Sequence, residues 1–200
     1  MSQGKTFQVT TALERTVQTY DVRKLNLLFV SSPPTPGVIA RVVAHKDVVY
    51  VAFADPNAGG GVWIFKRGKK SGELQQPSQR WGAWKELIVF GEWVVGAFGE
   101  ALVVWRRESG EVYTEIKMGG RCGVVTAVCH PSAYLNKLVV ARRNGDLEIW
   151  NIKTRYFMPD LRLNNGVADS GPARKSTPSS PWFRALQLPR RQSRFSYRVR

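Results

Sequence analysis

The feature that most constrains the fold is a strand pattern that returns four times along the chain. In each copy an apolar, variable, apolar triplet runs into an aromatic residue that is followed by a polar one. The aromatic residues are Tyr20, Phe65, Trp105 and Trp150, and the intervals between them are 45, 40 and 45 residues. Units of about 40 to 45 residues built from short alternating strands are typical of WD-type β-propeller blades. The repeat therefore predicts a scaffold of neighbouring small sheets rather than a catalyst.

Each repeat is expected to form a small antiparallel sheet, because apolar and polar residues alternate along its segments. A sheet of this size cannot bury both faces alone, so neighbouring copies must cover them. The strongest hairpin signal is the turn Asn144-Gly145, and the basic stretch at residues 67–80 is expected to be an exposed loop. Strands are expected at residues 7–12 and 15–21 in the first unit, with an apolar segment at 25–30 leading away; at 38–44, 48–53 and 62–66 in the second; at 84–90, 93–97, 101–106 and 112–117 in the third; and at 124–129, 138–141, 147–151 and 156–158 in the fourth.

The predicted fold class is all-β, with about four WD-repeat blades forming part of a larger or incomplete propeller. The repeats end near residue 158, so residues 1–158 are assigned to a partial propeller. Residues 159–200 are rich in Pro, Ser and Arg and are assigned to a disordered basic tail. An open arc of blades leaves an apolar face and strand edges uncovered, so we expect such a chain to be stable only within an assembly.

The net charge of +15 is unevenly distributed along the chain. Residues 161–200 carry nine Lys or Arg and one acidic residue, whereas residues 1–160 carry 21 basic and 14 acidic residues. In the tail, arginines such as Arg194 alternate with aromatic residues such as Phe195. Such a segment can stack on unpaired bases and neutralise phosphates. The same composition arises when a non-coding stretch is translated, so both interpretations stay open.

No motif in the chain supports catalysis, metal binding or a cofactor site. The only histidines are His45 and His130, and adjacent strand residues such as Cys129 and His130 point to opposite faces. The segment at residues 69–71 lacks the first glycine of a phosphate-binding loop. Cys122 and Cys129 fit neither a zinc nor a thioredoxin spacing, which indicates a reducing compartment. The apolar runs are far shorter than the ~20 residues of a membrane span, and the polar N-terminus shows no secretory signal.

Four segments of the chain carry a family resemblance. They are residues 16–31 (TVQTYDVRKLNLLFVS), 45–53, 61–68 with VWIFKRG, and 134–140 (YLNKLVV). In this order they resemble the N-terminal blades of the WD-repeat tandem-propeller subunits of the UTP-B subcomplex of the small-subunit processome. The resemblance covers residues 5–157, and family members continue through two full propellers and a helical C-terminal region. We therefore expect this chain to be either a truncated gene model, read through an intron or in another frame, or a genuine short form.

The resemblance implies a non-catalytic scaffold in the nucleus and nucleolus that acts in pre-ribosomal RNA processing and small ribosomal subunit biogenesis. Its implied partners are other propeller subunits of the UTP-B subcomplex, together with pre-ribosomal RNA and the U-three small nucleolar ribonucleoprotein. It implies no cofactor and no membrane association. Two alternatives stay open, namely a general nucleic-acid-binding module driven by the basic tail and a WD-repeat scaffold of another intracellular complex.

The hydrogen-bond network that WD repeats usually carry is degenerate in the fourth unit. Arg142 stands where Ser is usual, Asn144 stands where Asp is usual, and only Trp150 remains of the consensus set. If it is buried, the indole N–H of Trp150 therefore needs another acceptor.

Basic residues cluster beside predicted strand ends and turns, so we expect all of them to be exposed. Such charge is ordinarily solvated, and the sharper alternative is contact with RNA phosphates through counterion release. The possible RNA or partner contacts are Lys66, Arg67, Lys69, Lys70, Arg106, Arg107, Arg142 and Arg143.

Overall fold

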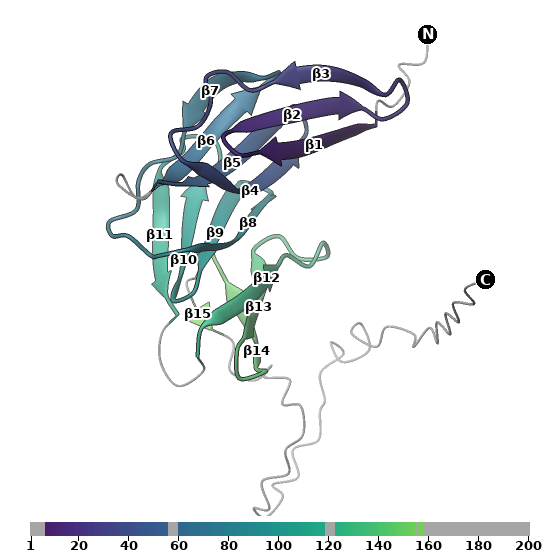
Figure 1. Ribbon diagram of the computed structural model, residues 1–200. Helices are drawn as coiled ribbons and strands as arrows, with labels where there is room; N and C mark the ends of the chain where they lie inside the picture. Colours follow the sequence, from purple (N-terminus) through teal and green to yellow (C-terminus); the bar gives the residue numbers. More distant parts are fainter. Residues whose placement is uncertain (1–6, 56–59, 119–122, 155, 158–200) are drawn as a thin grey trace, which may run out of the picture. The chain divides into compact units, whose positions relative to one another are not determined.

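The structure, a computed structural model, describes residues 7–55, 60–118, 123–154 and 156–157. These residues form fifteen β-strands, which assemble into four antiparallel sheets that follow one another in chain order (Figure 1). Across the described ranges, no helix is long and apolar enough to cross a membrane. The predicted tail at residues 159–200 lies outside the described residues.

Each sheet is built from strands that are consecutive in the chain. The first sheet contains β1 (Gln8–Leu13), β2 (Thr16–Asp21) and β3 (Asn26–Val30). The second contains β4 (Val38–His45), β5 (Val48–Ala54), β6 (Gly61–Lys66) and β7 (Lys69–Glu73). The third contains β8 (Trp84–Phe90), β9 (Trp93–Phe98), β10 (Ala101–Arg106) and β11 (Val112–Lys117). The fourth contains β12 (Val125–Cys129), β13 (Lys137–Arg142), β14 (Leu147–Asn151) and β15 (Tyr156–Phe157).

The four repeated aromatic residues occupy equivalent positions in the four sheets. Each lies on the strand next to the last one of its sheet, namely β2, β6, β10 or β14. In the first three sheets, the pairing with the last strand shifts register immediately before the aromatic residue. The residues paired with the aromatics on the preceding strand are all apolar: Val9, Val49, Val94 and Leu138. The predicted repeat is therefore confirmed as a repeat of structure.

Neighbouring sheets meet in a regular way. The first strands of the second, third and fourth sheets follow one another, with β4 against β8 and β8 against β12. The second strands β5 and β9 each also contact the first strand of the next sheet, β8 or β12. In the first sheet β1 makes the corresponding contact with β4. Since the aromatic strand β2 corresponds to β6, its neighbour β1 corresponds to the second strand β5, and the first sheet has no counterpart of β4 within the described residues.

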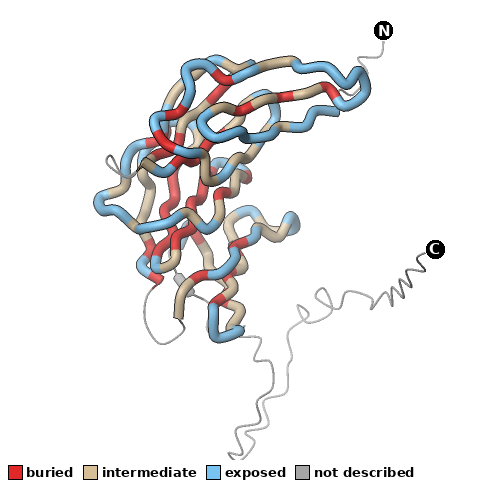
Figure 2. Tube along the Cα trace, viewed as in Figure 1, coloured by how far each residue is buried: buried red, intermediate tan, exposed pale blue. Residues whose placement is uncertain are grey.

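The buried core lies between the sheets. One apolar cluster joins the first and second sheets around Val17, Val51 and Phe65. A second cluster joins the second and third sheets and contains Trp105, and a third joins the third and fourth sheets around Leu102. Figure 2 shows the buried residues concentrated on the inner strands of the second and third sheets, as expected when each sheet covers its neighbours.

Two expectations about the strands are wrong. The stretch at residues 67–80 is not entirely a loop, because Lys69–Glu73 forms β7 and pairs with β6. The segment expected to lead away from the first unit instead forms β3 and pairs with β2. β7 is the outer strand of its sheet and meets Ser32 in an isolated bridge at Lys69. It leaves its alternate residues exposed, so its sequence carries polar residues and no apolar alternation.

Candidate interaction surface

The candidate contact residues divide between two ends of the sheets. Lys66, Arg67 and Lys69 lie around the β6–β7 turn. Arg106 ends β10, and Arg107 begins the corresponding turn of the next sheet. Because antiparallel strands alternate in direction, the turn after the third strand of a sheet lies at the end opposite to the turn after its second strand. Arg142 ends β13, and Arg143 begins a turn of that other kind, between β13 and β14. The structure thus places the basic clusters at two opposite ends of the sheets.

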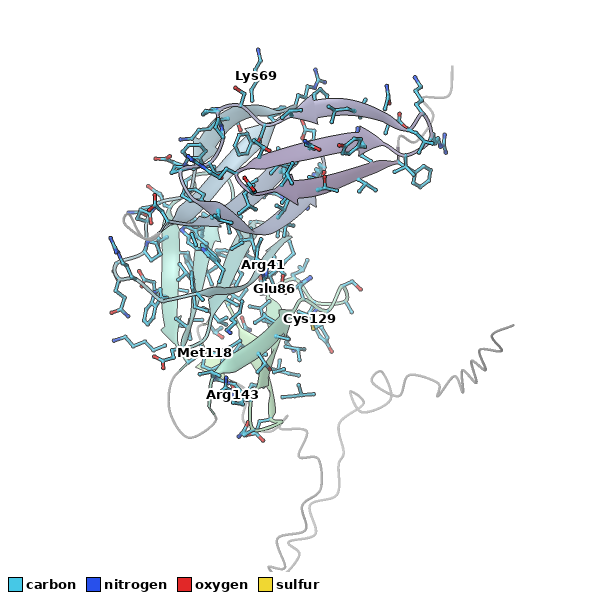
Figure 3. All side chains as sticks on the ribbon, viewed as in Figure 1. Arg41, Lys69, Glu86, Met118, Cys129 and Arg143 are labelled. Carbon is cyan, nitrogen blue, oxygen red and sulfur yellow. The ribbon has the colours of Figure 1, made fainter. Side chains whose placement is uncertain are left out.

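We call the first set, Lys66, Arg67, Lys69, Arg106 and Arg107, the basic rim. Four of these residues are exposed, and Arg107 is half-buried. A hydrogen bond of 2.8 Å between Arg107 Nη1 and His45 Nε2 connects the rim of the third sheet to that of the second. In Figure 3 the Lys69 side chain extends away from the ribbon. The basic rim therefore carries exposed basic side chains on two adjacent blades that are joined at this end.

Neighbouring groups modify the charge of the rim. Asp47 forms an exposed ion pair of 3.2 Å with Lys66 Nζ, and the hydrogen bond from Lys66 holds the pKa of the Asp47 carboxyl below its usual value. Burial lowers the pKa of His45, and the nearby positive charges of Arg107 and Lys46 lower it further. A neutral His45 can accept the Arg107 hydrogen bond, so the rim gains no charge from the histidine near neutral pH.

Aromatic rings support two of the basic side chains. The Arg106 guanidinium lies 5.2 Å from the centroid of Tyr113 and 5.9 Å from that of Trp93. The ammonium group of Lys70, which is half-buried on β7, lies 3.7 Å from the centroid of Trp63 and 2.8 Å from Glu73 Oε2. Lys70 is already engaged by both a ring and a carboxylate, so its charge is less available to a partner than that of Lys69.

Arg142 is buried, so the expectation that it is exposed is wrong. Only 6% of Arg142 and 3% of Glu148 is accessible, and the two side chains are joined by bonds of 2.8 and 3.0 Å to Glu148 Oε2. Arg142 Nη1 also donates to the backbone carbonyls of Met118 and Gly123. Trp150 Nε1 donates to the same Glu148 oxygen at 2.9 Å, which supplies the acceptor that the sequence called for. Arg142 therefore connects β13 to β14 and to the segment that precedes β12.

Arg143 is exposed at the start of the β13–β14 turn (Figure 3). Its backbone N–H donates to Val124 O at 2.9 Å, which positions the turn beside the chain that enters β12. Arg143 remains a candidate contact, and it belongs to a different end of the sheets from the basic rim.

Each of the two histidines contacts another element of the fold. His130 stacks on Phe90 at 3.8 Å between ring centroids, and its Nε2 contacts Tyr134 O, whereas Cys129 is exposed. Across the part of the chain that the structure describes, no three His, Cys, Asp or Glu side chains are grouped so that they could hold a metal ion. Both histidines serve to connect elements of the fold.

Comparison with known proteins agrees with this architecture. The family described as WDR36/Utp21 first beta-propeller matches residues 9–166, a match that extends beyond the predicted end of the repeats at residue 158. U3 small nucleolar RNA-associated protein 21 homolog of Schizosaccharomyces pombe is 33% identical over 156 residues, which are 76% of this chain and 16% of the relative. WD repeat-containing protein 36 of Homo sapiens is 27% identical over 176 residues, which are 84% of this chain and 18% of the relative. The chain thus spans less than a fifth of the length of these relatives.

Solved structures show the same fold at low sequence identity. The WD40 beta propeller domain of Doa1 aligns with a TM-score of 0.56 at 11% identity, over 76% of this chain and 49% of that one. The computationally designed Ika4 protein aligns with a TM-score of 0.56 at 19% identity, over 72% of this chain and 85% of that one. The four sheets are therefore WD-type propeller blades, and the described residues form an incomplete ring.

Proposed function

Because the chain belongs to the WDR36/Utp21 family, in the region of its first β-propeller, we propose that it is a non-catalytic WD-repeat scaffold of the nucleolar small-subunit processome. In this role it acts in pre-ribosomal RNA processing and small ribosomal subunit biogenesis. The observation that carries the proposal is the family match over residues 9–166, together with relatives that are named for association with U3 small nucleolar RNA.

The described architecture supports a scaffold. Buried apolar clusters join consecutive sheets, while turns at both ends of the sheets present exposed side chains. Such turns can contact several partners without any change in the core. The proposed partners are other propeller subunits of the UTP-B subcomplex, with pre-ribosomal RNA and the small nucleolar ribonucleoprotein in the same assembly. The proposed location is the nucleolus.

The basic rim is the surface that we assign to partner contact. Lys66, Lys69 and Arg106 are exposed and lie on two adjacent blades. A rim of this kind attracts an acidic protein surface or RNA phosphates and does not read base sequence. Its contribution to binding should therefore fall steeply as the salt concentration rises.

Affinity capture of the tagged full chain from cells tests the proposal. We expect other propeller subunits and pre-ribosomal RNA to be recovered together, and the absence of both would refute the scaffold role. Replacing Lys69 by Gln should weaken recovery, whereas replacing Lys117 by Gln removes the same charge at the opposite end of the third sheet and should not.

Deletion of residues 161–200, which carry a net charge of +8, addresses the general nucleic-acid-binding alternative. If the blades bind the protein partners, the chain that lacks residues 161–200 should still recover them. If the deletion abolishes RNA recovery and flattens its salt dependence while no propeller subunit is ever recovered, the tail-driven alternative is correct.

A further inference from the structure

The loop between β7 and β8 borders two hollows. The first, which we call the aromatic hollow, has a volume of about 470 Å³, within the ~300–1,000 Å³ range of ligand pockets. The second, which we call the cationic cleft, has a volume of about 630 Å³. Residues 79–82 line both hollows. One short segment thus separates an aromatic site from a charged one.

Aromatic rings dominate one wall of the aromatic hollow. Trp81, Trp84, Phe98 and Trp105 all line it. Phe98 and Trp105 are buried, whereas Trp81 and Trp84 are half-buried and retain accessible surface. The Trp84 and Phe98 ring centroids lie 4.5 Å apart, so Phe98 supports Trp84 from within the core.

The three indole N–H groups at the hollow are already satisfied by the protein. Trp81 Nε1 donates to Glu115 Oε2 at 2.9 Å, Trp84 Nε1 to Phe53 O at 3.2 Å, and Trp105 Nε1 to Gln75 O at 2.8 Å. These bonds fix the orientation of the rings before any ligand arrives. What the two half-buried indoles offer to a ligand is ring surface, which favours a planar aromatic group over a hydrogen-bonding one.

The loop that carries Trp81 is anchored on the third sheet. Ser78 donates to the Glu115 carboxylate from its backbone N–H at 2.6 Å and from its hydroxyl at 2.9 Å. Gly82 adopts a φ of +80°, and a Cβ at that position would meet no atom within 4 Å. The left-handed backbone at Gly82 turns the chain directly after Trp81 and carries no side chain there.

The cationic cleft carries the complementary chemistry. Arg80, Lys85 and Arg143 line it, and Glu100 is the only acidic residue among its lining residues. All four side chains are exposed, and they come from the β7–β8 loop, β8, the β9–β10 turn and the β13–β14 turn. Two blades and a loop thus present a net positive charge next to Trp81.

We propose that this junction binds an unpaired nucleotide of an RNA strand, with the base stacked on Trp81 and Trp84 and the adjoining phosphate in the cationic cleft. Single-stranded RNA combines a planar π-surface with a neighbouring negative charge, which matches the two hollows and their shared wall. A duplex does not fit, because its bases are stacked on each other. The scaffold role proposed above needs no direct contact with RNA, so this inference goes beyond it.

Photo-crosslinking to the full chain tests the site directly. The probe is a short oligouridylate that contains 4-thiouridine, and the crosslinked chain is digested with trypsin. Cleavage after Arg80 and Lys85 releases residues 81–85, which contain both half-buried tryptophans of the hollow. We expect crosslinks on this peptide, suppressed by unlabelled oligouridylate and not by duplex RNA. Crosslinks confined to residues 161–200 or to the basic rim would overturn the proposal.

Binding by variants separates stacking from general charge. Trp81→Ala should weaken oligouridylate binding by ~5- to ~100-fold, while Trp81→Phe retains a ring and should stay within a few-fold of the unmodified chain. Lys85→Gln should lower the slope of log affinity against log salt by about 1. The matched tail variant Trp182→Ala should leave the crosslink on residues 81–85 unchanged. Protection of Trp81 by an acidic tyrosine-containing peptide and not by oligouridylate would assign the site to a protein and contradict the proposal.

Discussion

The first sheet has three strands and the third has four, and the equivalent strands of the two sheets differ sharply in burial (Figure 2). In the third sheet every residue of β9 is buried, and β10 is buried up to Trp105. In the first sheet five of the six residues of β1 are exposed, and the sixth is half-buried. The strands themselves do not explain this contrast, since both sheets are antiparallel and carry their aromatic residue at the equivalent position.

The difference comes from the neighbours of each sheet. Along β10, Leu102 and Val104 face the cluster shared with the fourth sheet, while Val103 and Trp105 face the cluster shared with the second. The first sheet has only the second as a neighbour among the described residues, and Val17 on β2 faces it. Apolar residues on its other face stay exposed, including Val9 at 48% and Leu13 at 60%. A blade is thus stabilised mainly by the blades on either side of it.

Removing equivalent aromatic residues from the two sheets should give the largest contrast. Trp105→Ala deletes a side chain that is 1% exposed and should lower the free energy of unfolding by ~3–5 kcal/mol. Tyr20→Ala removes a half-buried ring and should cost ~1 kcal/mol. Urea unfolding followed by circular dichroism measures both, and equal losses would show that the two sheets do not differ as described.

Removing Glu148 should be nearly as damaging. Glu148→Ala leaves the buried Arg142 guanidinium without its carboxylate and the Trp150 N–H without its acceptor, at a cost of ~3 kcal/mol. The control Asp47→Ala breaks a fully exposed ion pair with Lys66 and should leave the urea midpoint unchanged. If both variants unfold at the same midpoint, the network around Arg142 does not stabilise the fourth blade.

A smaller effect is expected from Gly96 at the centre of β9. A Cβ at this position would lie 2.7 Å from Trp84 Cζ3 and 3.0 Å from Trp105 Cζ3, so both indoles occupy space that a side chain here would need. Gly96→Ala should therefore cost ~1–3 kcal/mol through overpacking. At Gly72 on β7 the nearest side-chain atom is 3.9 Å away, and Gly72→Ala in the same urea experiment should be close to neutral. A neutral Gly96→Ala would mean that the third sheet is packed less tightly than its burial indicates.

The smallest effect concerns pH. The pKa of His45 is lowered in the folded chain, mainly by burial, so the unfolded chain binds a proton more readily. The stabilisation by neutral His45 is complete above the unfolded pKa of about 6.5 and is lost as the pH falls through the lower, folded value. Between pH 7.5 and 5.5 the urea midpoint should therefore drop further for the unmodified chain than for His45→Gln. Identical drops would exclude His45 as a source of this dependence.

The sequence predicted most of the fold because its strongest signals are local. Alternation and terminal aromatics located β8, β10, β11 and β14 with their observed bounds, and the Asn144-Gly145 turn was found in place. The sequence did not predict β7, because this strand pairs with β6 through its main chain and carries no alternating apolar residues. Such pairing leaves no pattern in the sequence.

The candidate site was harder to predict, because exposure depends on partners that are distant in the chain. Arg142 stands beside a turn, which suggested exposure, yet it continues the buried alternation of Leu138 and Val140 on β13. Glu148 lies opposite Val140 on β14, so register would have placed the two charges on one face. The division of the basic residues between two ends of the sheets also follows from the topology. The hydrogen bond from Trp81 to Glu115 joins segments that are far apart in the sequence, so no local pattern predicts it.

Native-state hydrogen exchange measures the dependence of each blade on its neighbours most directly. If neighbouring blades stabilise one another, amides of Trp93–Phe98 and Ala101–Arg106 exchange slowest, and amides of Gln8–Leu13 exchange fastest among the strands. Uniform protection across the four sheets, or stronger protection in β1 than in β10, would contradict the account.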